Sequence, residues 1–230
     1  MIKKMEKIVI ATGGTGGHIF PAYSLAKHFT DKKINVELIS DKRGLRYLKD
    51  YNDLKITQIS SSSIFKKNIF KSFISSLIIL YAILRSFIFL LFNRPNFVFG
   101  MGGYSSFPIC IAAKVLRVPF IIYENNLYIG KANKYLLPFA KKAFVANKDL
   151  EGISKKYKNK LCEIGNIIRK EILNFKKKKY HDEKIKILIL GGSQAAKVFA
   201  DKLPQIFKEC KDSEIPLKIY QQCLESQNKF

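Results

Sequence analysis

Acidic side chains are scarce in this sequence. Its 230 residues include 18 aspartates and glutamates against 41 lysines and arginines, which gives a formal net charge of +23. So strong a positive charge attracts an anionic partner: a membrane surface, a nucleic acid or a phosphorylated substrate. Aromatic residues do not alternate with the basic ones in a nucleic-acid-binding motif, and the sequence has no pattern of a known nucleic-acid-binding fold. The sequence therefore argues against a nucleic acid as the partner.

Cysteine is also rare, and its placement excludes two kinds of site. Cys110, Cys162, Cys210 and Cys223 lie far apart and mostly in apolar surroundings. They have neither metal-ligand spacing nor the pattern of a disulfide framework, so we expect a reducing compartment. Internal repeats are not visible, and the opening MIKK leads straight into a strand rather than into a signal peptide. The apolar content of 47% is enough for a real core.

A dense glycine loop organises the N-terminal part of the chain. The sequence GGTGGHIFPA at residues 13–22 follows the apolar run IVIA at residues 8–11 and precedes a helix-like segment. Glycines let the backbone turn sharply, and a helix start adds free N–H donors and partial positive charge. This arrangement suits a phosphate or pyrophosphate. The alternative is a tight strand-to-helix turn without a ligand.

The loop lacks the dinucleotide-binding fingerprint. Counted from Gly14 and Gly16, that pattern needs a small residue where Ile19 stands. Asp41 ends the next predicted strand, where an acid could bind a ribose. The glycine spacing nevertheless argues against a nicotinamide-dependent enzyme.

Continuous apolar runs alternate with helical segments, which predicts a parallel sheet covered on both faces. We expect strands at residues 7–11, 36–40, 55–60, 97–100, 119–123, 143–146 and 161–165. Helices are expected at residues 18–30, 44–50, 107–117 and 131–140. The four-lysine run at residues 176–179 indicates a solvated linker. A second strand–glycine turn–helix pattern then starts with a strand at residues 185–190, and one more strand is expected at 218–222.

The segment at residues 73–92 stands apart, because sixteen of its 20 residues are apolar. It is long enough to span a bilayer, but Arg85 is costly there and the segment lies between two strands of one sheet. A buried crossover helix is a second alternative. We favour a helix with one face on the sheet and the other in the membrane interface. Replacing Ile79 and Ile83 by aspartate would test whether these residues contact lipid. Basic residues flank the segment and would meet anionic head groups: Lys66, Lys67, Lys71 and Arg94.

Two further loops follow predicted strands. The first is GMGGYSS at residues 100–106, and the second is YENN at residues 123–126. Ligands of parallel sheets lie beyond the carboxyl ends of the strands, so we expect these loops and the first glycine loop to share one crevice. Glu124 could accept a proton there and Asn126 could bind sugar hydroxyls. The alternative for Glu124 is a loop carboxylate that caps a helix.

Taken together, these motifs resemble the MurG family. The matching sequences are GGTGGH at 13–18, GMGGYSSFP at 100–108, YENN at 123–126, Gly165-Asn166 with Arg169, and GGSQAA at 191–196. The resemblance implies an α/β fold of the GT-B type, with two Rossmann-like domains facing a cleft and no metal or cofactor. It implies an inverting hexosyltransferase of peptidoglycan biosynthesis, which moves N-acetylglucosamine from UDP-N-acetylglucosamine to lipid-linked muramoyl-pentapeptide. The expected location is peripheral, on the cytoplasmic face of the bacterial inner membrane.

The resemblance also implies roles for particular residues. Thr15, Gly16 and Gly17 would lie at the substrate diphosphate and sugar. Residues that would contact the nucleotide-sugar are Asn126, Arg169 and Ser193. The acceptor pocket would be lined by His18, Tyr104 and Glu124. We favour His18 as general base because it opens a helix, with Glu124 as the competitor and Tyr104 orienting the substrate.

The chain departs from the family in three places. Tyr123-Glu124-Asn125-Asn126 replaces the usual His-Glu-Gln-Asn, and Ala195-Ala196 replaces Gly-Ala, so the methyl of Ala195 could crowd a phosphate. The family's second domain continues well beyond the end of this chain and holds the uracil and ribose contacts.

These departures set the expected domain organisation. We expect a complete Rossmann-like acceptor domain at residues 1–165, a linker at 166–183, and a truncated donor domain with an incomplete Rossmann-like fold at 184–230. We further expect the second part to be loosely held and the chain alone to have little transferase activity. The alternative function is a membrane-associated module that binds the lipid-linked acceptor without transfer.

Overall fold

The structure, a computed structural model, describes residues 7–51, 53–59, 69–175, 184–192 and 195–227. The chain divides into two compact units, Met1–Asn174 and Phe175–Phe230. The first unit therefore extends past residue 165 and includes part of the expected linker. The Tyr123 hydroxyl explains this extension, because it donates to the carbonyl of Gly165 at 3.3 Å and accepts from the amide of Ile167 at 3.2 Å.

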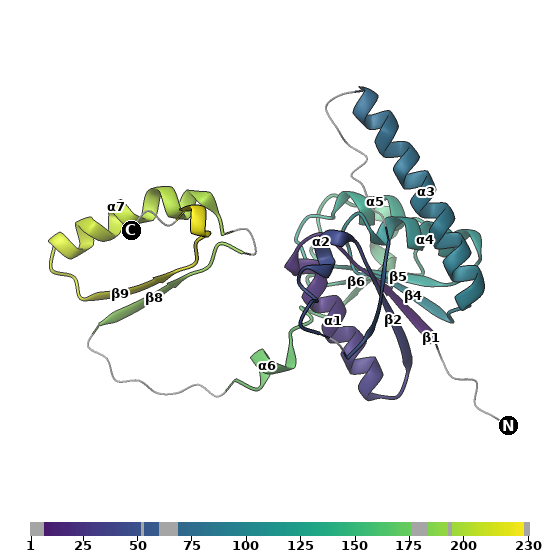
Figure 1. The fold of residues 1–230 in the computed structure, drawn as a ribbon, viewed down its shortest axis with the longest axis horizontal. Coiled ribbons are helices and arrows are strands. Elements are labelled where there is room, and N and C mark those ends of the chain that lie inside the picture. Colours follow the sequence, from purple (N-terminus) through teal and green to yellow (C-terminus); the bar gives the residue numbers. More distant parts are fainter. Residues whose placement is uncertain (1–6, 52, 60–68, 176–183, 193–194, 228–230) are drawn as a thin grey trace. The chain divides into compact units, whose positions relative to one another are not determined.

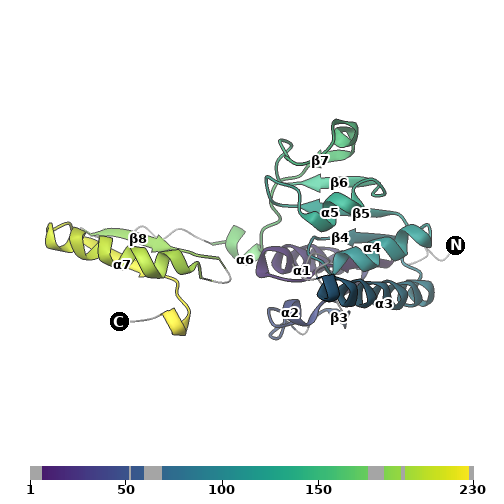
Figure 2. The same ribbon diagram turned by 90° about the horizontal axis from the view of Figure 1, so that it is seen from above.

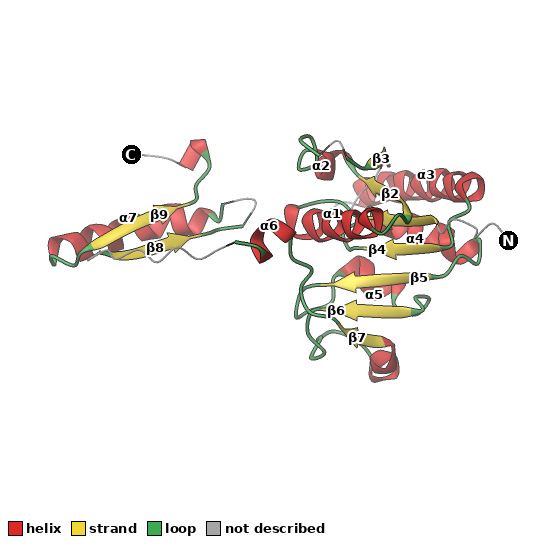
Figure 3. Ribbon diagram, turned by 90° about the horizontal axis from the view of Figure 1, so that it is seen from below, coloured by secondary structure: helices red, strands yellow, loops and turns green. Residues whose placement is uncertain are grey.

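The first unit is built on a seven-stranded parallel sheet, shown in Figure 3. Its strand order is β3-β2-β1-β4-β5-β6-β7. The strands are β1 (Lys7–Ala11), β2 (Asn35–Ser40), β3 (Lys55–Gln58), β4 (Phe97–Gly100), β5 (Phe120–Glu124), β6 (Lys142–Val145) and β7 (Leu161–Glu163). The sequence order reverses between β1 and β4, and open α/β sheets bind ligands at such a reversal.

Alternate side chains of each central strand enter two different cores. In β1, Val9 belongs to one core and Ile10 to the other. In β5, Phe120 lies in the first core while Tyr123 lies in the second. Because successive strand residues point to opposite faces, both faces of the sheet are buried at its centre, and the central strands β1, β4 and β5 are mostly apolar.

Helices cover the two faces of the sheet in the first unit (Figures 1 and 2). Residues of α1 (Gly16–Asp31) fill one core, and those of α3 (Ile69–Asn93), α4 (Ser106–Val115) and α5 (Lys131–Leu136) fill the other. Shorter elements are α2 (Lys42–Leu45), the 3₁₀ helix η1 (Lys155–Lys160) and α6 (Lys170–Leu173). Helix α3 packs against α4 on the outside of this layer.

Helix α3 buries only a narrow stripe. The buried side chains in its described part are Ser75, Ala82, Ser86 and Leu90. Large apolar side chains are exposed elsewhere on it: Phe73, Ile74, Leu77, Ile78, Leu80, Tyr81, Leu84, Ile88, Leu91 and Phe92. Residues Phe73–Asn93 are long and apolar enough to cross a membrane, with 22% of the most apolar stretch buried. The buried-crossover alternative is therefore wrong, and Ile79 and Ile83 are half-buried rather than on the most exposed side.

The second unit is one strand–helix–strand repeat. Strands β8 (Ile185–Ile189) and β9 (Leu217–Gln221) pair in parallel and are joined through α7 (Lys197–Asp212). The 3₁₀ helix η2 (Glu225–Gln227) follows. Of its described residues only Ala195 is buried. A unit with so little buried apolar surface has a weak core.

Several predicted boundaries shift for local reasons. Helix α2 begins and ends earlier than residues 44–50, because Asp41 caps it by accepting from the amide of Gly44 at 2.8 Å. Helix α5 ends at Leu136 rather than near residue 140, since Pro138 has no backbone N–H with which to continue the helical hydrogen bonds. Helix α6 was not predicted.

Candidate active site

Three loops meet at the carboxyl ends of β1, β4 and β5, as the sequence predicted. A cavity of about 170 Å³ lies between them. Its walls are the start of α1, the loop after β4, and the loop after β5 with the start of α5. The lining residues are His18, Gly102, Gly103, Tyr104, Glu124, Asn126, Gly130, Lys131, Ala132 and Asn133. The three strands are neighbours in the sheet, so one cavity can draw on all three loops.

The two glycine loops approach each other too closely for side chains. Gly103 has a φ of +76°, and a Cβ there would lie 2.5 Å from the carbonyl oxygen of Gly13. Gly102 has a φ of +84°, and its Cβ would lie 2.7 Å from Nδ1 of His18. Glycine is required at both positions for its backbone conformation and for the space it leaves.

Side chains from two neighbouring loops hold the first glycine loop in place. The side-chain amide of Asn125 donates to the carbonyl of Gly17 at 3.1 Å. The carboxylate of Asp41 accepts from the amide of Gly14 at 3.1 Å and also from the Arg43 guanidinium at 3.0 Å. Asp41 thus orders the loop and caps α2, which is a structural role rather than ribose binding.

The glycine loop leads into the start of α1, where no acidic side chain of the first turn neutralises the partial positive charge of the helix. Thr15 is the N-cap residue, and its carbonyl accepts from the amides of His18 and Ile19. The first turn contains no acidic residue, and the first amides of a helix have no intrahelical acceptor. Gly16 is buried whereas Thr15 and Gly17 are exposed, so this end is open to an anion.

His18 is held as a neutral base. Burial lowers the pKa of its imidazole from 6.5, and the charge of Glu124 and a hydrogen bond to the Met101 backbone oppose that shift only partly. A neutral imidazole keeps one ring nitrogen as a hydrogen-bond acceptor. Near pH 7 the imidazole can therefore take a proton from a ligand in the cavity.

Glu124 is buried and its carboxylate is saturated with donors. Oε1 accepts from the backbone and side-chain amides of Asn126, at 3.2 and 2.7 Å. Oε2 accepts from the amide of Gly130 at 2.8 Å and from Nδ2 of Asn133 at 3.0 Å. Gly130 is the N-cap residue of α5, so this arrangement is close to the helix-capping alternative. Glu124 positions the loop after β5 and the exposed Asn126 in it. The half-buried Tyr104 lines the cavity from the loop after β4.

Arg169 lies beside the same helix start although it is distant in sequence. Its guanidinium stacks on the ring of Phe20 with 4.4 Å between the guanidinium carbon and the ring centroid. The preceding segment is fixed by the Tyr123 hydroxyl through Gly165 and Ile167. Tyr123 thus replaces the family histidine with a side chain that connects β5 to the segment carrying Arg169.

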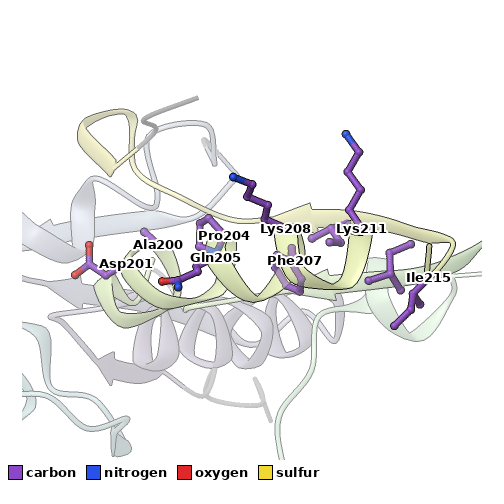
Figure 4. A pocket seen from close by; sticks show the side chains of 10 residues that line it. Ala200, Asp201, Pro204, Gln205, Phe207, Lys208, Lys211 and Ile215 are labelled. Atoms are coloured by element: carbon purple, nitrogen blue, oxygen red, sulfur yellow. The ribbon is translucent and has the colours of Figure 1, made fainter. Parts of the chain in front are cut away.

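Among the described residues, none of the predicted site residues lies in the second unit. Ser193 lies outside the described residues. Ala195 has a φ of +44°, a conformation that costs an alanine but not the glycine usual in the family. A larger cavity of about 930 Å³ runs along α7 and β9 (Figure 4). Its lining combines apolar side chains with four polar or charged ones: Asp201, Gln205, Lys208 and Lys211.

Sequence reasoning missed several residues that shape the cavity. Asn133 is buried beneath it, Asn125 ties two loops together, and Phe20 supports Arg169. A signal existed for Asn133, because it lies one turn after the loop that contains Glu124 and a buried asparagine needs a polar partner. Nothing in the pattern indicated Phe20. Among the described residues no cluster of three histidine, cysteine, aspartate or glutamate side chains could hold a metal ion.

Known proteins are similar to this chain in sequence and in fold. The glycosyltransferase family 28 N-terminal domain matches residues 8–145. The UDP-N-acetylglucosamine–N-acetylmuramyl-(pentapeptide) pyrophosphoryl-undecaprenol N-acetylglucosamine transferase of Pelagibacter ubique is 34% identical over 94% of the chain, and that of Rickettsia canadensis 38% over 95%. The crystal structure of Acinetobacter baumannii MurG superposes with a TM-score of 0.70 and 28% identity, covering 96% of this chain and 62% of that one. The chain spans about 60% of the length of these curated relatives.

Proposed function

Because the chain belongs to the family of the glycosyltransferase family 28 N-terminal domain, we propose that it serves an inverting N-acetylglucosaminyl transfer. The donor is UDP-N-acetylglucosamine and the acceptor is undecaprenyl-diphospho-muramoylpentapeptide, the lipid-linked precursor of peptidoglycan. The observation that carries this proposal is the cavity at the switch point, where a neutral histidine faces two glycine loops. The names of the relatives and the MurG fold of the first unit support it.

The first unit binds the acceptor in this proposal. The start of α1, with Thr15, Gly16 and Gly17, takes a diphosphate, because the first amides of a helix lack intrahelical acceptors and the first turn has no acidic residue. His18 and Tyr104 line the part that receives the sugar. The polar walls exclude bulk water and orient the acceptor hydroxyl toward His18.

The chemistry is a direct displacement at the anomeric carbon. His18 removes the proton from the acceptor hydroxyl as that oxygen attacks, and UDP leaves from the opposite face. We assign the base to His18 rather than Glu124 because the carboxylate of Glu124 already accepts four hydrogen bonds. Asn126 and Arg169 contact the nucleotide-sugar, and the Arg169 guanidinium offsets charge on the departing diphosphate.

Membrane contact is the second part of the proposal. The exposed apolar side of α3 lies in the interface of an anionic membrane, on the cytoplasmic face of the inner membrane. Arg85 and Arg94 are exposed on or next to this helix and would meet anionic head groups. The protein is then peripheral and meets its lipid-linked acceptor where that lipid resides.

A second candidate function is acceptor binding without transfer. It is favoured by the observation that the described residues lining the cavity all belong to the first unit. This module would hold the lipid-linked muramoyl-peptide at the membrane.

Two measurements on the purified chain separate these functions. One follows labelled N-acetylglucosamine from its UDP derivative into a lipid-linked acceptor, and the other follows acceptor binding. Transfer that is lost in His18→Ala supports the transferase. Binding with no transfer supports the binding module, and absence of both contradicts both proposals. His28→Ala is the matched control, because His28 is exposed on the same helix and away from the cavity.

A further inference from the structure

The hydroxyl of Tyr123 is a polar group inside the core at the carboxyl end of β5. Tyr123 is 3% exposed, and its ring belongs to the core that α1 fills. Burial raises the pKa of the phenol, and the hydrogen bond from the Ile167 amide opposes that shift only in part. The phenol is therefore neutral near pH 7, so it can donate one hydrogen bond and accept another.

Both hydrogen bonds of this hydroxyl go to a backbone segment that is distant in sequence. The hydroxyl donates to the carbonyl of Gly165 at 3.3 Å and accepts from the amide of Ile167 at 3.2 Å. These groups precede Arg169 by four and two residues. The segment is also held by packing of Ile167 on the core and by the exposed Lys170–Asp31 ion pair, which contributes little. The hydroxyl thus supplies the polar anchor directly before Arg169.

The side chain of Arg169 lies near the start of α1. Its guanidinium carbon is 4.4 Å from the centroid of the Phe20 ring. That ring lies against Gly16, the first residue of α1, because a Cβ on Gly16 would be 3.0 Å from Cε2 of Phe20. Stacking uses the face of the guanidinium and leaves the N–H groups at its edge to phosphate oxygens. The cation and the positive end of the helix therefore favour an anion in the same region.

We propose that Tyr123 is a positioning residue, whose hydroxyl fixes the backbone before Arg169 so that the guanidinium stays stacked on Phe20 and ready for the diphosphate of the nucleotide-sugar. The inference rests on the proposed function in that Arg169 binds this diphosphate. An arginine that is ordered in advance loses less side-chain entropy when the ligand binds. Removal of the hydroxyl should therefore weaken binding although no charge is lost.

Four variants isolate the hydroxyl. Tyr123→Phe removes it and keeps the ring, Arg169→Gln removes the charge, and Phe20→Leu removes the stacking surface. Tyr23→Phe is the matched control, because Tyr23 is a buried tyrosine of the same core whose hydroxyl donates to Asp53 at 3.1 Å instead. Unfolding temperatures are measured first, and binding is measured well below the lowest of them.

The binding probe is UDP, the leaving group of the proposed donor, followed by calorimetry. We expect Arg169→Gln to bind UDP about tenfold more weakly, as for the loss of one charge-assisted hydrogen bond, and Tyr123→Phe about threefold more weakly. The double variant should bind no more weakly than Arg169→Gln alone, because the hydroxyl acts through the arginine. Tyr23→Phe should bind as the original chain does. Undiminished binding by Tyr123→Phe, or additive losses in the double variant, overturns the inference.

A direct readout follows the guanidinium without a ligand. In protein labelled with ¹⁵N-arginine, the Nε–H signal of Arg169 is identified by its absence in Arg169→Gln. The ring current of Phe20 displaces this signal while the stack persists. We expect Tyr123→Phe and Phe20→Leu to return it toward the ordinary arginine position, and Tyr23→Phe to leave it in place. An unchanged signal in Tyr123→Phe overturns the inference. If the signal moves as expected but Arg169→Gln binds UDP undiminished, the positioning stands and the proposed role of Arg169 in donor binding is wrong.

Discussion

Gly103 and Gly165 have nearly the same backbone conformation but different surroundings. Their φ angles are +76° and +74°. A Cβ on Gly103 would lie 2.5 Å from the Gly13 carbonyl oxygen, whereas a Cβ on Gly165 would have nothing within 4 Å. The conformational cost of a side chain is therefore common to both positions, and the steric cost belongs to Gly103 alone.

This difference predicts the stabilities of two alanine variants. Gly165→Ala should lower the free energy of unfolding by about 1–2 kcal/mol, the cost of a left-handed conformation. Gly103→Ala should lower it further, because the two glycine loops must separate. Denaturant unfolding followed by circular dichroism measures both. Equal losses in the two variants would contradict the close contact between the loops.

His18 makes stability depend on pH. Burial lowers the pKa of its imidazole below 6.5, so the folded chain binds fewer protons than the unfolded chain just below that pH. The stability associated with this group is complete above about pH 6.5 and is lost as pH falls through the folded pKa. His18→Gln should therefore lose less stability than the original chain between pH 7.5 and 5. Thermal unfolding at several pH values measures this, with exposed His28→Gln as control; identical pH profiles for the original chain and His18→Gln would contradict it.

At the scale of elements, the sequence predicted regular structure better than the contacts between elements. Strands β1 and β4 have the predicted bounds, because each is a continuous apolar run that ends at a polar or glycine turn. The meeting of three loops followed from the order of parallel strands. The segment that carries Arg169 could not be placed this way. It is held by the hydroxyl of Tyr123, and no local pattern relates these distant residues.

Helix α3 shows the same limit within one element. Its composition predicted an apolar helix, but the identity of its exposed side depends on where α4 contacts it. Ser75, Ala82, Ser86 and Leu90 form the buried stripe, so two serines face the protein while most of the large apolar residues are exposed. A reading by hydropathy alone assigns those serines to solvent.

The exposed side of α3 predicts vesicle binding. Leu77 is 51% and Leu84 55% exposed, so aspartate at both positions should abolish binding to anionic vesicles while leaving the unfolding temperature nearly unchanged. Leu173→Asp is the control, because Leu173 is 65% exposed but lies on α6. Binding of the original chain should weaken as salt rises. Undiminished binding of the Leu77/Leu84 variant in a vesicle sedimentation assay would exclude this surface.

At the scale of the whole molecule, the two units differ in how much they bury. The first has two cores on opposite faces of its sheet. In the second, α7 has no buried residue and its strands are half-buried at most. Local opening is easiest where few apolar contacts hold the backbone. The units should therefore differ in stability although they belong to one chain.

Hydrogen exchange measures this difference. Backbone amides of β8, α7 and β9 should exchange much faster than those of β1, β4 and β5 in the same sample. Helix α4, with most of its residues buried, is the internal reference for a protected helix. Equal protection of α4 and α7 would show that the second unit is as stable as the first.

The hydrogen bond between Asn125 and Gly17 also determines the order in which α3 and the cavity form during synthesis. These residues are 108 positions apart, so the contact closes only after the intervening chain, including α3, has left the ribosome. At about 5–20 residues per second, α3 emerges a few seconds before the loop that contains Asn125. The apolar side of α3 therefore leaves the ribosome before the cavity can form.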